Sequence, residues 1–219
     1  MVIAILGGSF DPPHKMHDAI AQHVIDRRLA DKIMVMPCAE RMNKKLSQDV
    51  KRLEMCKLMW GSDKNFIISD LSIKCQESRT LKLFEFILIN EKIQSIFHNR
   101  EPNQYKFIIG DDCAKEIYQN KWYESNRLME EVPFIVFKRH NNEFLVTCHD
   151  SFISHWYYKY PHKYEGYYPN HRSNISSTLI RQRILSNEYK NWETWVDKTI
   201  GNDLVVNYIK EHSLYRKPI

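Results

Sequence analysis

Residues 3–17 of this chain read Ile3-Ala4-Ile5-Leu6-Gly7-Gly8-Ser9-Phe10-Asp11-Pro12-Pro13-His14-Lys15-Met16-His17. The first four residues form a short apolar run, which is typical of a strand buried on both faces. Two glycines and two prolines break this run, and from Asp18 the apolar residues recur at helical spacing. A helix N-terminus that follows a strand and a tight turn favours phosphate binding, because free N–H groups and the helix dipole meet there. The stretch therefore predicts a phosphate site beside His14 and His17.

Strand-like and helical segments alternate along the rest of the chain. Apolar runs predict further strands at 32–36, 65–69, 105–109 and 132–138, with a sixth candidate at 143–148. Helical spacing predicts helices at about 18–30, 49–60, 79–97, 175–185 and 203–212, and a short one after Asp112. This alternation predicts an α/β fold, a Rossmann-like, doubly wound and mainly parallel sheet with helices on both faces. We expect one domain over 1–219, of which about 186–219 form a small helical C-terminal part.

The predicted helix at 79–97 is the longest, and we expect its apolar side to face the sheet. That side is predicted to carry Leu81, Phe84, Leu88 and Ile96.

The composition is that of a soluble globular protein, with 43% hydrophobic residues, 27% charged residues and a formal net charge of +5. No apolar run approaches the roughly 20 residues of a membrane-spanning helix, so no membrane partner is expected. The N-terminal run has no basic region or cleavage signal, and the five cysteines are scattered without a Cys-x-x-Cys pair. We therefore expect reduced thiols and a cytoplasmic location.

A second motif, late in the chain, reads Ile175-Ser176-Ser177-Thr178-Leu179-Ile180-Arg181 and predicts a serine-capped helix start. The two motifs together resemble the nucleotidyltransferases of the His-x-Gly-His superfamily. More narrowly, the chain resembles the nicotinate or nicotinamide mononucleotide adenylyltransferases. The resemblance extends to Ile108-Ile109-Gly110-Asp111-Asp112 followed by Trp122, and to the segment 206–215.

The resemblance implies an enzyme of NAD synthesis in which the mononucleotide phosphate attacks the α-phosphorus of ATP in line and expels pyrophosphate. It implies ATP as a substrate and Mg²⁺ that bridges phosphate oxygens, with no metal site built from protein ligands. The implied catalytic residues are His14, His17 and Arg181. Contacts to ATP are implied for Gly8, Ser9, Phe10, Gly110, Asp112, Ser177 and Thr178. Contacts to the pyridine mononucleotide are implied for Lys44, Thr80 and Trp122.

Two positions depart from the family pattern. Met16 stands where the family has the glycine between the two histidines, so its side chain must point away from the adenosine or reshape that site. Before the long helix, only Thr80-Leu81 matches the family's Ser-Tyr-Thr-type segment. That segment helps to distinguish nicotinate from nicotinamide, so the choice between the two bases stays open.

Other functions compete with this one. His14 and His17 could be zinc ligands, but the spacing supplies no third or fourth ligand. A transferase for another phosphorylated acceptor, such as phosphopantetheine, is the second hypothesis, and an inactive nucleotide- or nucleic-acid-binding protein is the third. The Tyr-, His- and Lys-rich segment 155–171 could stack on bases, but we expect it to cover the active site or form a subunit contact. Small-molecule substrates are thus the expected partners, nucleic acid is not favoured, and a homo-oligomer stays open.

Overall fold

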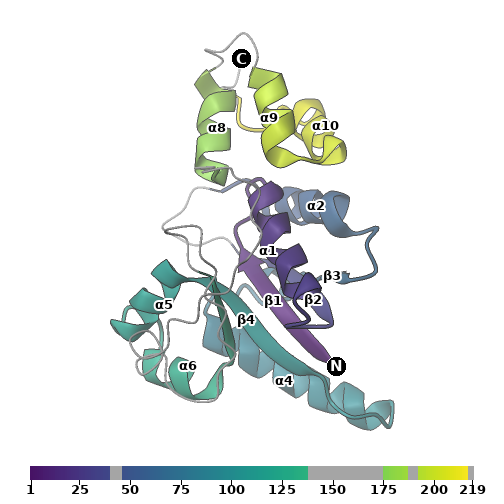
Figure 1. Cartoon of the computed structure of the whole chain (residues 1–219), viewed down its shortest axis with the longest axis vertical. Helices are drawn as coiled ribbons and strands as arrows, with labels where there is room; N and C mark the ends of the chain where they lie inside the picture. Colours follow the sequence, from purple (N-terminus) through teal and green to yellow (C-terminus); the bar gives the residue numbers. More distant parts are fainter. Residues whose placement is uncertain (40–45, 138–174, 187–191, 217–219) are drawn as a thin grey trace.

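The computed structural model describes residues 1–39, 46–137, 175–186 and 192–216. Within these residues, five strands form one parallel sheet in the order β3-β2-β1-β4-β5 (Figure 1). The strands are β1 (Val2–Gly8), β2 (Lys32–Pro37), β3 (Phe66–Ile68), β4 (Gln104–Gly110) and β5 (Phe134–Phe137). The predicted Rossmann-like α/β fold is confirmed. The sixth strand predicted at 143–148 lies outside the described residues.

The strand order places a switch point between β1 and β4. The chain adds β2 and β3 on one side of β1 and then crosses to build β4 and β5 on the other side. Leu6 of β1 pairs with Ile108 of β4, so Gly8 and Gly110 end two neighbouring strands at the same edge of the sheet. Open α/β sheets bind ligands at the carboxyl ends of the strands on either side of such a switch point.

The described helices are α1 (Lys15–Asp26), α2 (Asp49–Trp60), α3 (Leu71–Lys74), α4 (Thr80–Phe97), α5 (Asp111–Tyr118), α6 (Ser125–Glu131), α8 (Ser177–Ser186), α9 (Trp192–Ile200) and α10 (Asp203–Glu211). Two of them, α3 and α6, were not predicted from the sequence, and α9 lies within the helical C-terminal part predicted for about 186–219 without having been predicted as a separate helix. Helix α1 begins three residues before the predicted start at Asp18. Its N-cap is His14, which follows directly on Pro13. Both histidines of the first motif therefore belong to a helix N-terminus.

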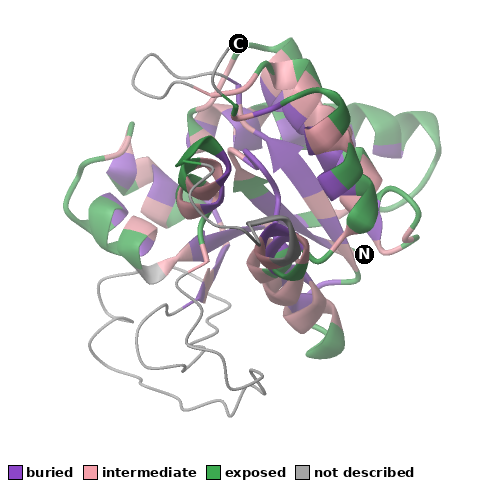
Figure 2. Ribbon diagram, turned by 90° about the horizontal axis from the view of Figure 1, so that it is seen from above, coloured by how far each residue is buried: buried purple, intermediate pink, exposed green. Residues whose placement is uncertain are grey.

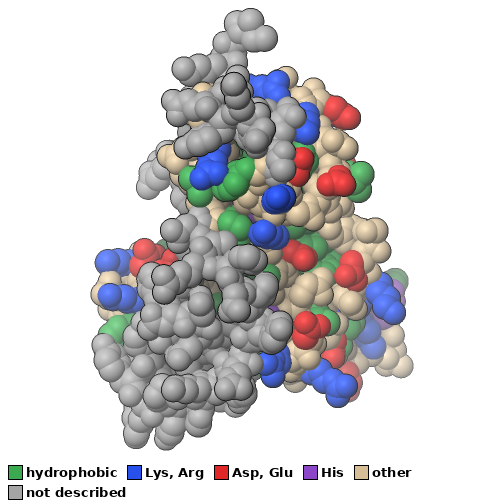
Figure 3. All heavy atoms as spheres, turned by 45° about the horizontal axis from the view of Figure 1, so that its top comes forward, with side chains coloured by type: hydrophobic (Ala, Val, Ile, Leu, Met, Phe, Trp, Pro, Cys, Tyr) green, Lys and Arg blue, Asp and Glu red, His purple; other side chains and the backbone are tan. Residues whose placement is uncertain are grey.

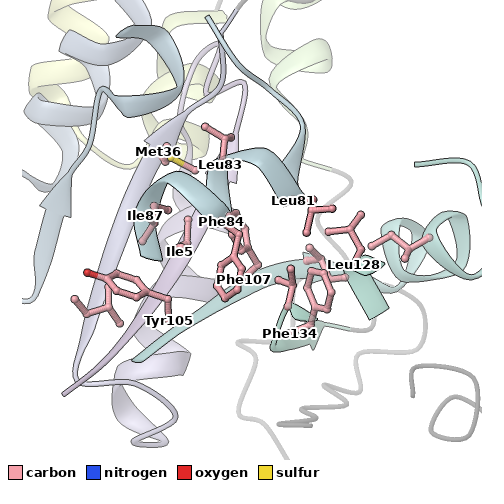
Figure 4. Close-up of a cluster of buried hydrophobic side chains, with 14 of the residues drawn as sticks. Ile5, Met36, Leu81, Leu83, Phe84, Ile87, Tyr105, Phe107, Leu128 and Phe134 are labelled. Carbon is pink, nitrogen blue, oxygen red and sulfur yellow. The ribbon is translucent and has the colours of Figure 1, made fainter. Parts of the chain in front are cut away.

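The sheet has an apolar core on each face, because successive side chains of a strand point to opposite sides. Ile3 and Ile5 of β1 belong to the core under α4 and α6, whereas Ala4 and Leu6 belong to the core under α1 and α2. Figure 4 shows the first of these cores, in which the inner side of α4 packs against β1 and β4. In Figure 2 the buried residues concentrate in the central strands, and the exposed residues lie on the outer sides of the helices.

A third apolar core joins the C-terminal helices to the sheet layer (Figure 1). Met55 of α2 lies in this core with Ile180 of α8, Ile200 of α9 and Val206 of α10. Helix α2 thus packs on the sheet with one side and on the C-terminal helices with another. The extent of a single domain over 1–219 stays a prediction. Within the described residues, no helix combines the length and the apolar composition needed to cross a membrane.

Candidate active site

The two histidines of the first motif lie against each other at the N-terminus of α1. The backbone N–H of His14 donates a hydrogen bond to Nδ1 of His17 at 3.2 Å. The two rings stack with their centroids 3.7 Å apart and their planes at 20°. Because Nδ1 of His17 accepts, the neutral ring carries its proton on Nε2, which makes that nitrogen a donor. The pair therefore offers imidazole N–H chemistry at a helix end that already favours an anion.

The segment between β1 and α1 is tightly packed. Gly8 ends the strand, and its carbonyl accepts from the Cys38 N–H at 2.9 Å. Phe10 has a left-handed φ of 48° and is 1% exposed, and its ring contacts His17 edge-on at 5.0 Å between centroids. A Cβ atom on Gly8 would lie only 3.2 Å from the Phe10 ring. A glycine at this position therefore leaves room for the Phe10 ring, which packs edge-on against the His17 ring.

Helix α8 contacts the first motif through its own N-terminal turn. The Ser177 hydroxyl donates to the Pro12 carbonyl at 2.9 Å, and Nη1 of Arg181 donates to the Asp11 carbonyl at 2.6 Å. Nη2 of Arg181 donates to Oγ1 of Thr178 at 3.3 Å. The structure thus brings the two sequence motifs together, and it assigns part of the hydrogen-bonding capacity of Ser177 and Arg181 to holding α8 on the turn. A guanidinium has five donors, so Arg181 keeps capacity for a phosphate.

Asp11 links the first motif to three distant parts of the chain, a role that sequence reasoning missed because no local pattern indicates it. Its carboxylate is buried, with 1% of the residue exposed. Oδ1 accepts from the Tyr215 hydroxyl at 2.7 Å, Oδ2 accepts from the Ser47 N–H at 3.1 Å, and Nη1 of Arg181 lies 3.9 Å from Oδ2. Burial, reinforced by the neighbouring carboxylate, raises the pKa of Tyr215 well above its ordinary value. The hydroxyl therefore stays protonated and keeps donating to Asp11.

Arg52 is a second organising residue whose role sequence reasoning missed. Its side chain is fully buried in α2 and is ion-paired with Asp49. Nη1 donates to the Ser9 carbonyl at 2.7 Å, Nη2 to the Cys38 carbonyl at 2.6 Å, and Nε to the Ser47 carbonyl at 3.0 Å. The guanidinium thus joins the segments that follow β1 and β2. Two signals were available in the sequence: the segment Arg52-x-x-Met55 resembles part of the family pattern, and the spacing of three residues from Asp49 indicates a helical ion pair. Neither signal indicates burial.

The other predicted residues lie outside the two motifs, at the end of β4, in and after α5, and at the start of α4. Gly110 ends β4 and is the N-cap of α5, and Asp112 is exposed in the first turn of that helix. Trp122 lies between α5 and α6, is half-buried against the core, and donates from Nε1 to Oε2 of Glu116 at 2.9 Å. Thr80 is the first residue of α4. Lys44 and the segment 155–171 lie outside the described residues.

The departing residue Met16 is half-buried in the first turn of α1. Its position in that turn, between the two histidines, is the one that the family pattern predicts for glycine.

Charge is mixed on the face shown in Figure 3, where Lys and Arg side chains of the described residues lie interspersed with Asp and Glu. The described residues visible there form no continuous basic surface of the kind that holds a nucleic-acid backbone. Within the described ranges, no group of three or more His, Cys, Asp or Glu side chains is arranged to hold a metal ion. The described part of the site thus consists of imidazole, guanidinium, hydroxyl and backbone groups around the buried Asp11 carboxylate.

Comparisons with known proteins agree with this geometry. A family model described as cytidylyltransferase-like matches residues 5–183. The probable nicotinate-nucleotide adenylyltransferase of Fusobacterium nucleatum is 30% identical over 86% of this chain and 90% of its own length. The nicotinate-nucleotide adenylyltransferase of Bacillus subtilis is 28% identical over 97% of both chains.

The fold also matches that of a solved structure, the Plasmodium falciparum nicotinic acid mononucleotide adenylyltransferase complexed with NaAD. The TM-score is 0.67 at 24% identity, over 98% of this chain and 97% of the other. The resemblance predicted from the two sequence motifs is confirmed. The chain belongs to the cytidylyltransferase-like family and, within it, to the nicotinate-nucleotide adenylyltransferases.

Proposed function

We propose that this protein transfers the adenylyl group of ATP to nicotinate mononucleotide and releases pyrophosphate. The observation that carries the proposal is the contact between the two motifs, in which Ser177 and Arg181 of α8 donate to the Pro12 and Asp11 carbonyls of the turn that leads into α1. Two helix N-termini, two stacked imidazoles and a guanidinium at one point form a site for a polyphosphate. The choice of nicotinate mononucleotide as the acceptor rests on the names of the relatives.

In this reaction the protein has to position the two substrates and to neutralise the charge on their phosphates. The 5′-phosphate of the mononucleotide is already an anion near pH 7, so no protein base has to generate the nucleophile. One of its oxygens forms a bond to the α-phosphorus of ATP, and the bond from that phosphorus to the bridging oxygen of pyrophosphate breaks. Negative charge accumulates on the leaving group and on the α-phosphoryl oxygens. Preorganised donors aimed at those oxygens lower the barrier.

The proposed roles are those that the family resemblance implies, and the meeting of the two motifs supports them. His17 donates from Nε2 to the α-phosphoryl group, with His14 beside it, while Arg181 and Thr178 hold the β- and γ-phosphates. The backbone of 8–10 lies along the nucleotides, and Gly110 and Asp112 face the ATP ribose across the switch point.

For the mononucleotide, we propose contacts to Trp122, Thr80 and Lys44. The Trp122 indole would stack on the pyridine ring with its N–H still bound to Glu116, because that bond lies in the plane of the ring. Mg²⁺ would be held by the phosphate oxygens of ATP, a binding mode that the ion commonly uses, and we assign it no protein ligand.

We also propose that the protein works in the cytoplasm. Support comes from the cysteines within the described residues, since Cys38, Cys56, Cys75 and Cys113 form no disulfide.

A pyrophosphate-release assay tests the proposed function. Purified protein is given ATP and Mg²⁺ with nicotinate mononucleotide, nicotinamide mononucleotide or phosphopantetheine in separate reactions. We expect turnover with a pyridine mononucleotide, and higher kcat/KM with the nicotinate form. Turnover with phosphopantetheine alone would establish the alternative acceptor. ATP binding without turnover of either pyridine substrate would overturn the proposal.

A histidine variant tests the proposed catalytic role. His17→Ala is expected to lower kcat by about 10²-fold or more, the usual effect of losing one donor to a developing oxyanion. The matched control is His212→Ala at the C-cap of α10, because His212 is exposed and its ring stacks on Tyr208 and contacts the Tyr208 carbonyl at 3.1 Å. The control is expected to keep its activity within about twofold. Full activity in His17→Ala would refute the role of His17 and leave the function itself standing.

A further inference from the structure

Helix α4 carries apolar side chains on its outer side as well as on its inner side. Its inner side is buried against the sheet through Leu81, Phe84 and Ile87 (Figure 4). The residues that form what we call the outer stripe, with their exposed fractions, are Phe86 (41%), Ile89 (58%), Ile93 (56%), Ile96 (72%) and Phe97 (80%). Leu88 (43% exposed) and Ile96 were both predicted to face the sheet, and for these two residues the prediction is wrong. A soluble helix normally places polar residues on the side that it turns away from the core.

The outer stripe is one continuous surface. At 100° per residue, its five members fall within about a third of the helix circumference, opposite the buried side. From their exposed fractions, they present on the order of 600 Å² of apolar area, which is at the upper limit of the patches that monomers expose. In Figure 1, α4 lies along the lower part of the molecule, and the stripe follows it towards the start of β4. The stripe therefore runs away from the strand ends that hold the candidate active site.

Polar groups near the outer stripe are already engaged with their own chain. The Asn90 side chain turns back along the helix and donates from Nδ2 to the Phe86 carbonyl at 2.9 Å. Lys82 and Glu85 pair with each other at 2.9 Å at the N-terminal end of the stripe. Glu91 points inward and accepts from the Tyr105 hydroxyl at 2.7 Å. Covering the stripe would therefore leave none of these polar groups without its bond.

The spacing of the outer stripe is self-complementary. Phe86, Ile89, Ile93 and Ile96 stand three, four and three residues apart, so the apolar pattern reads the same in both directions. Two copies related by a twofold axis and crossing in antiparallel fashion would place Phe86 opposite Ile96 and Ile89 opposite Ile93. An isologous interface has this property, because the same patch serves both subunits. Together the two stripes would bury about 1,200 Å², which reaches the lower limit for specific, stable interfaces.

We propose that the outer stripe of α4 is a dimer interface, occupied by the same stripe of a second copy of this chain. The twofold axis passes between Ile89 and Ile93, near the middle of the helix. The candidate active sites lie at the opposite ends of the strands, so each subunit keeps its own site open to substrate.

Sedimentation velocity over a range of protein concentrations tests the interface. We expect the wild-type chain to sediment as a dimer. Ile93→Glu would bring two uncompensated charges to the axis and is expected to weaken dimerisation about 100-fold or more. The control is Leu204→Glu, which places the same charge on an apolar residue of α10 that is 58% exposed, and it is expected to remain dimeric. Adenylyl transfer per chain and the far-UV spectrum should be unchanged in both variants.

A charge-pair experiment tests the register. Because Ile89 of one copy faces Ile93 of the other, an equimolar mixture of Ile89→Lys and Ile93→Glu chains is expected to form heterodimers, although each variant alone sediments as a monomer. A wild-type chain that stays monomeric at every concentration would overturn the proposal. So would a dimer that survives Ile93→Glu. Failure of the mixture to pair would overturn the antiparallel register.

Discussion

Tyr215→Phe tests how strongly the buried Asp11 carboxylate holds the candidate site together. The change removes one hydroxyl, which donates to Oδ1 of Asp11 at 2.7 Å, and leaves the ring in its apolar surroundings. A hydrogen bond to a charged group contributes about 1.5–3 kcal/mol. The carboxylate would keep the Ser47 N–H and the more distant Arg181 as partners. We therefore expect the free energy of unfolding to fall by about 2 kcal/mol near pH 7.

The pH dependence of that loss is a second test. The pKa of Tyr215 is raised in the folded protein, mainly by burial and also by Asp11, whereas the unfolded chain ionises near pH 10. The stabilisation is therefore fully present below about pH 10. Above that pH the unfolded state releases the proton and the folded state retains it, so the wild type loses stability by up to about 1.4 kcal/mol per pH unit. The Phe variant has no hydroxyl proton to lose, so the difference in free energy of unfolding between the two proteins becomes smaller as the pH rises.

Urea unfolding followed by intrinsic fluorescence, at a series of pH values from neutral to alkaline, measures both effects. The matched control is Tyr208→Phe on α10, whose half-buried ring stacks on His212 with centroids 4.0 Å apart. The control is expected to change the free energy of unfolding by no more than about 0.5 kcal/mol. A loss in Tyr215→Phe no larger than the control's, or a loss that stays constant across the alkaline range, would refute the reasoning.

Three further predictions concern other residues. Burial acts to raise the pKa of Glu91, but hydrogen bonds from Arg100, Asn103 and Tyr105 lower it to about 2. The ionised Glu91 therefore stabilises the folded state fully above the ordinary pKa of 4.5, and this stabilisation is lost as the pH falls towards about 2. Glu91→Gln should therefore cost about 2 kcal/mol at pH 7 and progressively less in acid, as measured by urea unfolding; a cost that is independent of pH would contradict this. Arg52→Lys should lower the free energy of unfolding by about 3 kcal/mol, because an ammonium group cannot reach all the carbonyls that the guanidinium binds; a change of less than about 1 kcal/mol would show that the fork is dispensable. Gly8→Ala should displace the Phe10 ring and lower kcat/KM by about tenfold with the melting temperature little changed, and unaltered kinetics would refute that coupling.

The layered fold was predictable because its signals are local. Each strand of the sheet appears as a short apolar run, and glycine or proline ends several of them, as Gly8, Pro37 and Gly110 do. Helices of three or more turns show their period in the sequence. Helices α3 and α6 have four and seven residues, which is too short for a helical period to be distinguished from chance. Helix α4 misled the prediction in a different way, because apolar residues on both of its sides hide which side is buried.

The candidate site was predictable only in part, for a related reason. Its motifs give the residue types that meet a phosphate, and their order in the chain indicates the family. The supporting bonds of Asp11 and Arg52 depend on tertiary contacts between residues that lie far apart in sequence, and one chain without its fold carries no sign of them. Arg52 reaches Ser9 across 43 positions, and Tyr215 reaches Asp11 across 204.

These separations have a consequence for how the protein refolds. The bonds from Ser177, Arg181 and Tyr215 to the first motif span 165, 170 and 204 positions. Contacts of such length close the largest loops and are the slowest to form, whereas β1 and β2 pair across a single short helix. After dilution from denaturant, the sheet should therefore acquire its circular dichroism signal before the two motifs meet. Recovery of catalytic turnover should trail recovery of secondary structure, because the site belongs to the last contacts of the chain to close.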